Sequence, residues 1–317
     1  MLTVYKHEDG EFVSDQTVAD ATKGSWISLI NPDTDELALV NIMTEIPTDV
    51  LKAALDIEER SHVEIEDNYI FVVINIPYIR GVDSYDTVPL GIFITPDFFI
   101  TVCLKENEIL YPFMNNQIPT FFTFKKTRFL FQIMYRTATL FLRYLQQINH
   151  RTDDIEVQLR HTTKNKDFFQ LLELQKSLTY FTSALRTNGT VMERILRFRR
   201  YEDFTKLLKM YEEDEDLLED VIIENKQAIE MVEMYTNILI NMMDAFTSII
   251  SNNLNMVMKF LASMTILLAV PTVIFSFWGI NVDLPFQGEP LGFLMVIGIA
   301  VIATCMAILA LWRNDLL

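Results

Sequence analysis

Near the C-terminal end of the chain, one set of residues recurs at alternating spacings of four and three. The set is almost throughout small or polar and comprises Asp244, Ser248, Ser251, Asn255, Met258, Ala262, Thr265, Ala269, Thr272, Ser276 and Gly279. A spacing that averages about 3.5 residues keeps one helix face turned toward a shared supercoil axis. Hydroxyl and amide oxygens on such a face can replace part of a cation's hydration shell. The stripe therefore predicts a water-accessible path for cations.

Close helix packing is the competing explanation, because small residues in membrane helices let two backbones approach each other. Asp244 and Asn255 favour the path, since packing alone has no use for a carboxylate or a carboxamide at these positions. Two spans in one chain cannot enclose a pore. The path interpretation therefore requires several copies of the chain around one axis.

Two uncharged apolar runs lie in this part of the chain, Leu261–Ile280 with 20 residues and Leu291–Trp312 with 22, and the first contains the stripe from Ala262 to Gly279. At about 1.5 Å per residue, each is long enough to cross a hydrocarbon core of ~30 Å. Lys259 and Arg313 flank the pair, whereas the loop 281–290 between the runs contains no Lys or Arg. The positive-inside bias predicts a cell (inner) membrane protein with both termini in the cytoplasm.

The 317-residue chain carries a formal net charge of −17, of which all but −1 lies in residues 1–255. This acidic part argues against nucleic acid as a partner and is compatible with cation binding. The N-terminus has no apolar signal-peptide core, so we expect the soluble part to stay in the cytoplasm. No catalytic pattern, organic-cofactor motif or grouped histidine–cysteine site is present, which predicts a protein that is not an enzyme.

Residues 1–120 mix strand and helix signals and predict a cytoplasmic α/β domain with a mixed sheet. Helices are expected at Asp35–Glu45 and Thr48–Ile57, the first started by Pro32-Asp33-Thr34. The expected strands are short β-branched and aromatic runs. These runs are Trp26–Ile30, Tyr69–Ile76, Val88–Ile94 and Phe98–Cys103.

From about Phe121 onward the pattern is helical, with breaks expected at Lys164–Lys166 and Arg186–Gly189. No Gly or Pro occurs between the acidic stretch at 211–216 and Pro271, so one helix of about 60 residues is expected to run into the first span. The fold class is thus an α+β domain followed by a long stalk helix and two C-terminal transmembrane helices. The expected divisions are 1–120, 121–255, 256–280, 281–290, 291–313 and 314–317.

The segment NMVMKFLASMTILLAVPTVIFSFWGIN resembles the first membrane helix of the CorA family of magnesium transporters. The matching features are a Lys after a Met in the neck, a mid-span Pro-Thr, and an aromatic-Gly-x-Asn ending. The segments WISLINP at 26–32 and EERSHVE at 58–64 also resemble this family's N-terminal domain. The resemblance covers essentially the whole chain and implies a funnel-shaped homopentamer that conducts Mg²⁺.

By the matching positions, Gly279, Ile280 and Asn281 would ring the outer mouth, with Asn281 contacting the hydrated ion. Met258 and Leu261 would form a hydrophobic constriction that gates by dewetting. The polar and small positions expected to line the rest of the pore are Thr272, Ala269, Thr265, Asn255, Ser251 and Asp244. Asp220 matches a carboxylate that binds a regulatory Mg²⁺ between subunits, with Asp83 or Asp86 of a neighbour as its partner. No organic cofactor is implied.

The sequence departs from the family's signature at Ile280, where the family has Met. Relatives with a branched aliphatic residue there include the zinc-transporting ZntB branch. The stripe and the loop contain no His or Cys, which favours a hydrated hard cation such as Mg²⁺ over Zn²⁺. Three alternatives stay open: Co²⁺ or Ni²⁺ as the cargo, a zinc transporter with or without proton coupling, and a non-transporting ion sensor.

Overall fold

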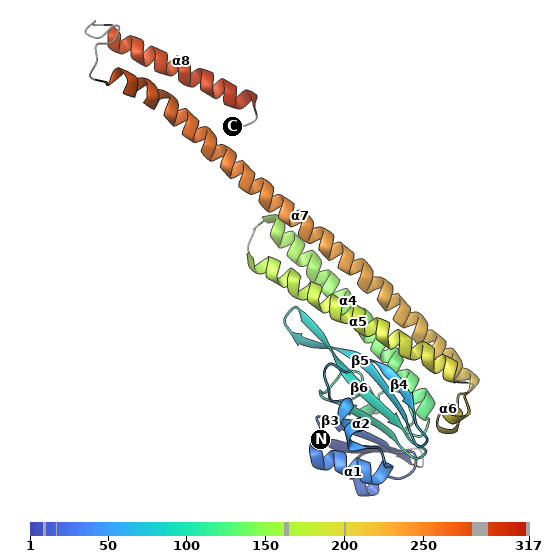
Figure 1. Ribbon diagram of the computed structural model, residues 1–317. Coiled ribbons are helices and arrows are strands. Elements are labelled where there is room, and N and C mark those ends of the chain that lie inside the picture. The colour runs from blue at the N-terminus through green and yellow to red at the C-terminus, as the bar shows by residue number, and fades with distance from the viewer. Residues whose placement is uncertain (9–10, 17, 162–164, 200, 281–290, 315–317) are drawn as a thin grey trace. The chain divides into compact units, whose positions relative to one another are not determined.

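The computed structural model describes residues 1–8, 11–16, 18–161, 165–199, 201–280 and 291–314 (Figure 1). They form two compact units, Met1–Met243 and Asp244–Leu317. The first unit holds a β-sheet with its helices and the start of helix α7 (Glu212–Trp278). The second holds the rest of α7 and helix α8 (Gly292–Arg313). The predicted order of an α+β part, a long helix and two apolar C-terminal helices is confirmed.

Seven strands form one sheet in the order β2-β1-β3-β7-β6-β5-β4. Strands β3 and β7 run parallel, and the other neighbouring pairs are antiparallel, which confirms the predicted mixed sheet. The strands are β1 (Leu2–Glu8), β2 (Glu11–Gln16), β3 (Trp26–Ile30), β4 (His62–Ile65), β5 (Ile70–Gly81), β6 (Ser84–Ile94) and β7 (Phe99–Cys103). The four predicted strands correspond to β3, β5, β6 and β7.

The sequence did not reveal β1, β2 and β4, which lie at or next to the two edges of the sheet. Strands with a solvent-facing side carry charged residues, and their apolar signal is therefore weak. Lys6 and Glu8 in β1 and Glu64 in β4 are examples. The core strands β5 and β7 are buried over most or all of their length and are much easier to recognise.

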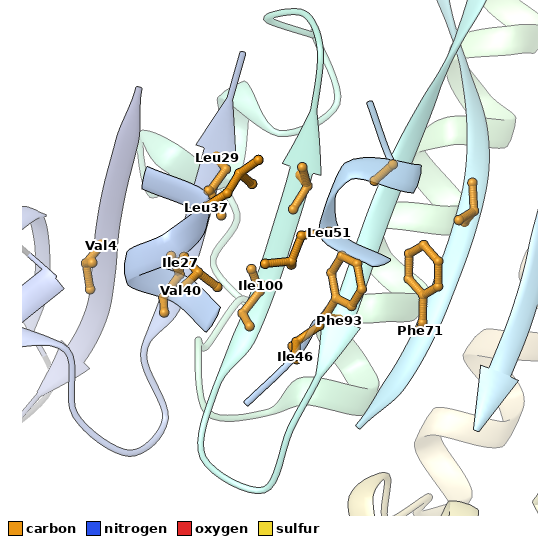
Figure 2. Close-up of a cluster of buried hydrophobic side chains, with 13 residues drawn as sticks. Val4, Ile27, Leu29, Leu37, Val40, Ile46, Leu51, Phe71, Phe93 and Ile100 are labelled. Atoms are coloured by element: carbon orange, nitrogen blue, oxygen red, sulfur yellow. The ribbon is translucent and has the colours of Figure 1, made fainter. Parts of the chain in front are cut away.

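Helices α1 (Thr34–Thr44) and α2 (Thr48–Ala53) cover one face of the sheet. Helix α1 starts where predicted, because Asp33 and Glu36 form a reciprocal capping box that satisfies two free backbone N–H groups. Figure 2 shows the apolar side chains of both helices against the strands. The cluster contains Val4, Ile27, Leu29, Leu37, Val40, Ile46, Leu51, Ala54, Phe71, Val73, Phe93, Ile100 and Val102.

Trp26 of β3 lies on the other face of the sheet. Ile27 and Leu29 of the same strand belong to the cluster on the α1 side. The Trp26 ring stacks edge-on against Phe129 at 5.0 Å, and its indole N–H donates to Thr101 Oγ1 at 2.9 Å. Phe129 belongs to helix α4 (Lys126–His161). Most of the apolar residues of α4 that follow are buried inside the first unit, so the apolar segment from Phe129 to Tyr144 is a core helix and not a span.

Helix α5 (Asn165–Phe198) packs against α4 and against β4, β5 and β6. The remaining short elements are a 3₁₀ turn (Val18–Asp20), α3 (Tyr111–Met114) and α6 (Glu202–Leu207). The break expected at Lys164–Lys166 falls between the end of α4 at His161 and the start of α5 at Asn165; Lys164 itself lies outside the described residues.

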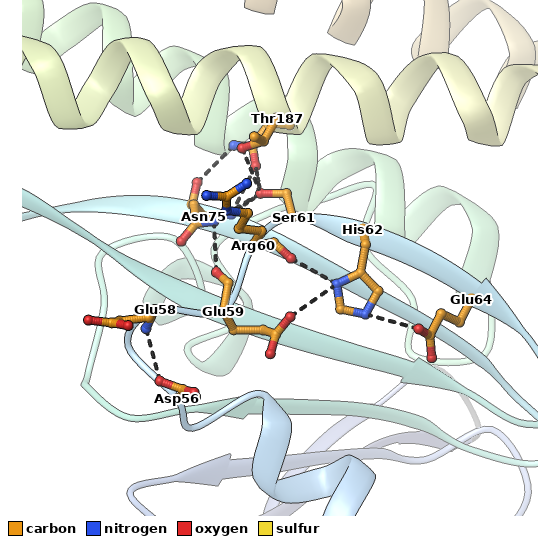
Figure 3. A network of polar contacts seen from close by, with 10 residues as sticks. Asp56, Glu58, Glu59, Arg60, Ser61, His62, Glu64, Asn75 and Thr187 are labelled. Atoms are coloured by element: carbon orange, nitrogen blue, oxygen red, sulfur yellow. Dashed lines mark hydrogen bonds and ion pairs between the residues drawn. The ribbon is translucent and has the colours of Figure 1, made fainter.

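The break predicted at Arg186–Gly189 is wrong, because α5 is continuous through these residues. Asn188 is fully buried and hydrogen-bonds the backbone of Asn75 in β5, so it serves packing and not a turn. A Cβ atom on Gly189 would lie 3.0 Å from Asn225 Nδ2 of α7. Gly189 therefore permits close contact between two helices. Figure 3 shows Asn75, Ser61 and Thr187 meeting under α5.

Candidate ion pathway

Helix α7 is a single helix of 67 residues, about 100 Å long at the usual rise. Its first turn contains Glu212, Glu213, Asp214 and Glu215, whose charges complement the positive end of the helix dipole. Asp214 is buried and accepts a hydrogen bond from the Tyr211 N–H at 3.2 Å. The predicted continuous helix from the acidic stretch into the first apolar run is confirmed.

Both C-terminal helices are long and apolar enough to cross a membrane, and little of either apolar stretch is buried within the chain. A core helix of a soluble protein would instead be covered by its own domain. The exposed apolar residues of α7 and α8 therefore require another apolar environment, either lipid or neighbouring copies.

One face of α7 in the second unit packs toward α8. Ser263 is buried, and the positions that continue its face toward the end of the helix are partly buried, as are their counterparts on α8. On α7 these positions are Leu267, Val270, Ile274 and Trp278. On α8 the buried positions are Gly292, Ala300 and Leu311.

The polar stripe lies on the opposite side of α7. Each stripe residue Thr265, Ala269, Thr272 and Ser276 stands two positions from a residue of the α8 face. Two positions along an α-helix correspond to a rotation of about 200°. All the predicted pore-lining positions from Asp244 to Thr272 are exposed in the single chain. Helix α8 therefore leaves the stripe uncovered.

Three hydroxyl groups of the stripe share one hydrogen-bonding pattern. Thr265 and Thr272 donate to the carbonyl oxygens of Leu261 and Leu268, at 2.8 and 2.7 Å, and Ser248 donates to that of Asp244 at 3.0 Å. A hydroxyl that uses its hydrogen within the helix presents its oxygen as an acceptor. This arrangement suits contact with a cation or with its hydration water.

Pro271 lies inside α7, next to Thr272. Proline has no N–H, so the helix bond to the carbonyl of Leu267, four residues earlier, cannot form. The helix nevertheless continues for about two more turns to Trp278. The Thr272 hydroxyl bond to Leu268 lies at the same place and gives the weakened turn an additional hydrogen bond.

An apolar section interrupts the polar stripe. Met258 and Leu261 are 58% and 53% exposed, and Asn255 lies about one turn before Met258. Thr272 lies about 25 Å along the helix from Asn255. Polar groups thus flank an apolar section on both sides, which is the order of features in a pore gated by dewetting.

Helix α7 ends at Trp278, and the Gly279 N–H donates to the carbonyls of Phe275 at 3.0 Å and Ser276 at 3.2 Å. A Cβ atom on Gly279 would lie 3.2 Å from the Phe275 oxygen, which explains why a residue without a side chain is favoured there. Ile280 is 44% exposed. Asn281, predicted to contact the ion at the entrance, lies outside the described residues.

The predicted regulatory residues lie in different surroundings. Asp220 is exposed on α7. Asp83 stands at the β5–β6 turn with a positive φ of 58°, and its carboxylate accepts from Arg151 Nε at 2.7 Å and Gln170 Nε2 at 3.1 Å. Asp86 accepts from the Thr87 N–H and lies 3.9 Å from Arg80. Within one chain, these bonds do not join either aspartate to Asp220.

Arg151 was not predicted to be near Asp83, because 68 positions separate them and no local pattern links them. The Asp83 charge also affects Tyr85, whose hydroxyl pKa is raised by burial and further by this carboxylate. Among the described residues, no three His, Cys, Asp or Glu side chains gather as a metal site. His62 lies 3.5 Å from Glu59 and 3.7 Å from Glu64, and these three side chains do not form such a metal site (Figure 3).

A profile of the family described as CorA-like Mg²⁺ transporter protein matches residues 22–313, which is most of the chain. The chain belongs to the CorA family. This is a family of membrane transporters and not of enzymes, consistent with the absence of a catalytic pattern in the sequence.

Two comparisons with CorA of Methanocaldococcus jannaschii support this assignment. The cobalt/magnesium transport protein CorA of this organism is 26% identical over 282 residues, covering 87% of this chain and 86% of the relative. The complete structure of the CorA magnesium transporter from the same organism has a TM-score of 0.83 at 23% identity, covering 99% of this chain and 98% of the other. The predicted fold class is thereby confirmed as that of CorA.

The cytoplasmic domain of ZntB from Vibrio parahaemolyticus also shares the fold of this CorA-family chain. The TM-score is 0.61 at 11% identity, over 80% of this chain and 97% of the ZntB domain. The soluble part of the fold therefore does not distinguish between the two kinds of transporter.

Proposed function

We propose that five copies of this chain form a channel for the uptake of divalent cations, with Mg²⁺ as the main cargo and Co²⁺ and Ni²⁺ as further candidates. The observation that carries the proposal is the polar stripe of α7, exposed on the side away from α8. Five such helices around one axis would turn the stripes inward, and five copies of α8 would separate them from lipid. Small residues in the stripe would also permit close approach.

The chemistry of the stripe favours a hydrated hard cation. Mg²⁺ gives up its water reluctantly and prefers oxygen contacts. Asn281 would contact the hydrated ion at the outer mouth, and Thr272, Asn255 and Asp244 would present oxygen atoms farther in. The stripe and outer loop contain no imidazole or thiol group, the ligands that Zn²⁺ commonly takes.

Met258 and Leu261 would form the gate, since an apolar ring of small radius loses its water and stops ions. Intracellular Mg²⁺ would hold the gate shut by binding between neighbouring cytoplasmic domains at Asp220. Asp220 is exposed and has the free lone pairs for such a contact. Loss of this ion would leave like charges facing each other and favour separation of the subunits.

The direction of transport follows from the charges at the ends of the spans. Lys259 and Arg313 favour cytoplasmic termini in the cell membrane, and the outer loop carries Asp283 and Glu289. A potential of 100 mV contributes ~2.3 kcal/mol per charge, or ~4.6 kcal/mol for a divalent ion moving inward. The membrane potential would therefore drive uptake without a nucleotide.

Zinc transport, with or without proton coupling, is the second candidate. Ile280 occupies the position where the CorA signature has Met, and branched aliphatic residues there occur in the ZntB branch. The ZntB cytoplasmic domain shares this chain's fold. These two observations concern the entrance residue and the soluble domain, whereas the oxygen-lined stripe supports Mg²⁺.

Reconstitution into liposomes tests the proposal. We expect Mg²⁺ entry, reported by an enclosed Mg²⁺-sensitive dye, and its loss in Asn281→Ala. Gln287→Ala, which removes another carboxamide from the same loop, is the matched control and should retain flux. Entry of Zn²⁺ without Mg²⁺ would replace the first candidate by the second. No flux of any divalent ion would contradict both and leave a membrane ion sensor.

A further inference from the structure

A cavity of about 940 Å³ lies in the first unit, between the start of α4 and the segment that leads from α6 into α7. Its volume is at the upper end of the range typical of small-molecule sites. The Thr127 hydroxyl donates to the Lys209 carbonyl at 2.7 Å, which ties the two walls together. The cavity is unrelated to the ion pathway, since all of its lining residues precede residue 215.

The lining of the cavity is basic, although the chain as a whole is strongly acidic. Five of its lining residues carry a positive charge and three carry a negative one. The positive residues are Lys125, Lys126, Arg128, Lys206 and Lys209. The three carboxylates offset only part of this positive charge, and the excess that remains attracts anions. This concentration of charge points to an anionic ligand.

Not every one of these charges is available to a ligand. Lys126 Nζ donates to the carbonyls of Thr95 and Pro96, at 2.5 and 3.0 Å, and Lys206 lies 3.9 Å from Glu202. The two hydrogen bonds of Lys126 hold its ammonium group at the wall, and Glu202 offsets part of the Lys206 charge. The ligand must therefore be recognised mainly by the others.

Lys125 and Lys209 are both exposed, and neither has a carboxylate partner among the described residues. Lys125 Nζ lies 5.0 Å from the centre of the Phe122 ring. This contact orients the ammonium group and does not neutralise its charge. Arg128 pairs through NH1 with the exposed Glu213 at 2.8 Å, and this leaves other guanidinium donors for a ligand. These three side chains come from both walls of the cavity.

The start of α4 adds to this charge. Helix α4 has 36 residues and no acidic residue in its first turn, so its own side chains do not offset the positive end of the helix. Asp214, the acidic residue with the lowest exposure in the lining, is engaged with the Tyr211 N–H. The field within the cavity therefore favours a ligand with several negative charges.

Two aromatic side chains stand at the cavity with most of their surface uncovered. Phe124 is 52% exposed and Tyr211 is 68% exposed. Exposed aromatic rings next to a basic groove provide surfaces on which a nucleobase can stack. A ligand that consists of phosphate groups alone would not stack on these rings.

We propose that this cavity binds a nucleoside polyphosphate, with Lys125, Lys209 and Arg128 on the phosphates and Phe124 or Tyr211 against the base. Inorganic polyphosphate shares the phosphate chemistry and lacks the base. The experiment therefore compares ATP, tripolyphosphate and adenosine as probes.

Binding is measured by calorimetry on the full-length protein in detergent, with free Mg²⁺ held constant. ATP should bind saturably, more tightly than tripolyphosphate, and adenosine should bind weakest. Lys125→Ala/Lys209→Ala should weaken ATP binding by about tenfold or more, because two charge-assisted contacts are lost. Lys52→Ala, which removes an exposed lysine from α2, should leave it unchanged.

A second variant, Phe124→Ala/Tyr211→Ala, changes only exposed side chains and should bring the affinity for ATP close to that for tripolyphosphate. Equal binding of ATP and tripolyphosphate by the unmodified protein would overturn the nucleoside assignment. No saturable ATP binding, or full affinity in the double lysine variant with an unchanged melting temperature, would overturn the site. These readings do not depend on ion flux.

Discussion

The side-chain amide of Asn188 in α5 pairs with the backbone of Asn75 in β5. Asn188 Oδ1 accepts from the Asn75 N–H at 2.9 Å, and Asn188 Nδ2 donates to the Asn75 carbonyl at 2.8 Å. Asn188 has no exposed surface. Ser61 joins the pair by donating to Asn188 Oδ1 at 2.7 Å. A helix and a strand more than a hundred residues apart are thus joined through one buried amide.

Asn188→Leu should destabilise the cytoplasmic part. The leucine cannot replace the amide, so the buried Asn75 carbonyl and the Ser61 hydroxyl lose their partner, at a cost of about 2–4 kcal/mol. Thermal unfolding followed by circular dichroism would measure the loss. Thr190→Ala, an exposed change two residues later in α5, is the control and should melt like the unmodified protein. Equal melting of both variants would contradict a stabilising role for the Asn188 amide.

Cysteine scanning along α7 should distinguish its two faces. Cysteines at Ala269, Thr272 and Ser276 should react with a water-soluble thiosulfonate and block flux. Cysteines at Leu267, Val270 and Ile274, on the face toward α8, should react far more slowly. Similar rates for both sets would indicate that the stripe is a packing face.

The scan requires only one background change, Cys305→Ser. Burial raises the pKa of the Cys103 thiol to about 11, so this group stays protonated and unreactive at neutral pH. Any labelling of the background protein before unfolding would show that Cys103 is more accessible than its position in β7 indicates.

Asp220 and Asp83 should respond differently to substitution. Asp220→Ala should weaken the protection that Mg²⁺ gives the cytoplasmic part against protease, while the melting temperature without Mg²⁺ stays the same, because Asp220 is exposed. Asp83→Ala should lower the melting temperature, since Arg151 and Gln170 lose their acceptor. Unchanged protection in Asp220→Ala would remove this residue from the proposed regulatory site.

His7 should make stability depend on pH. Burial lowers the pKa of His7, against a smaller opposing effect of its hydrogen bond with Asn116, and its Nδ1 accepts from the Thr123 N–H at 3.2 Å. The unfolded chain therefore takes up this proton first. The contribution is fully present above about pH 6.5 and declines as the pH falls toward the lowered pKa.

His7→Gln retains an acceptor without a titrating group and is the matched variant. The difference in melting temperature between the unmodified protein and His7→Gln should change between pH 7.5 and pH 5.5, with the unmodified protein losing more. A constant difference would show that His7 is protonated equally in both states.

The long helix and its stripe could be predicted because their signals are local. A run without Gly or breaking Pro favours one helix, and two uncharged stretches of about 20 residues favour spans, whatever the rest of the chain does. The core strands β3, β5, β6 and β7 were equally visible, since strands buried on both faces are apolar throughout. Residue spacing likewise placed Asp244 to Gly279 on a single face.

The tertiary structure determined those features that depend on contacts between distant parts of the chain, which residue spacing does not encode. The sequence indicated a break at Arg186–Gly189, but the hydrogen bond from Asn188 to β5 and the contact of Gly189 with Asn225 keep α5 continuous, because a buried partner outweighs a local propensity. The pairing of Asp83 with Arg151 has the same origin. Finally, the residue spacing predicted a stripe on α7, but only the packing of α7 against α8 showed that this stripe is exposed. One face of a helix differs from the other in exposure only when a neighbour buries one of them.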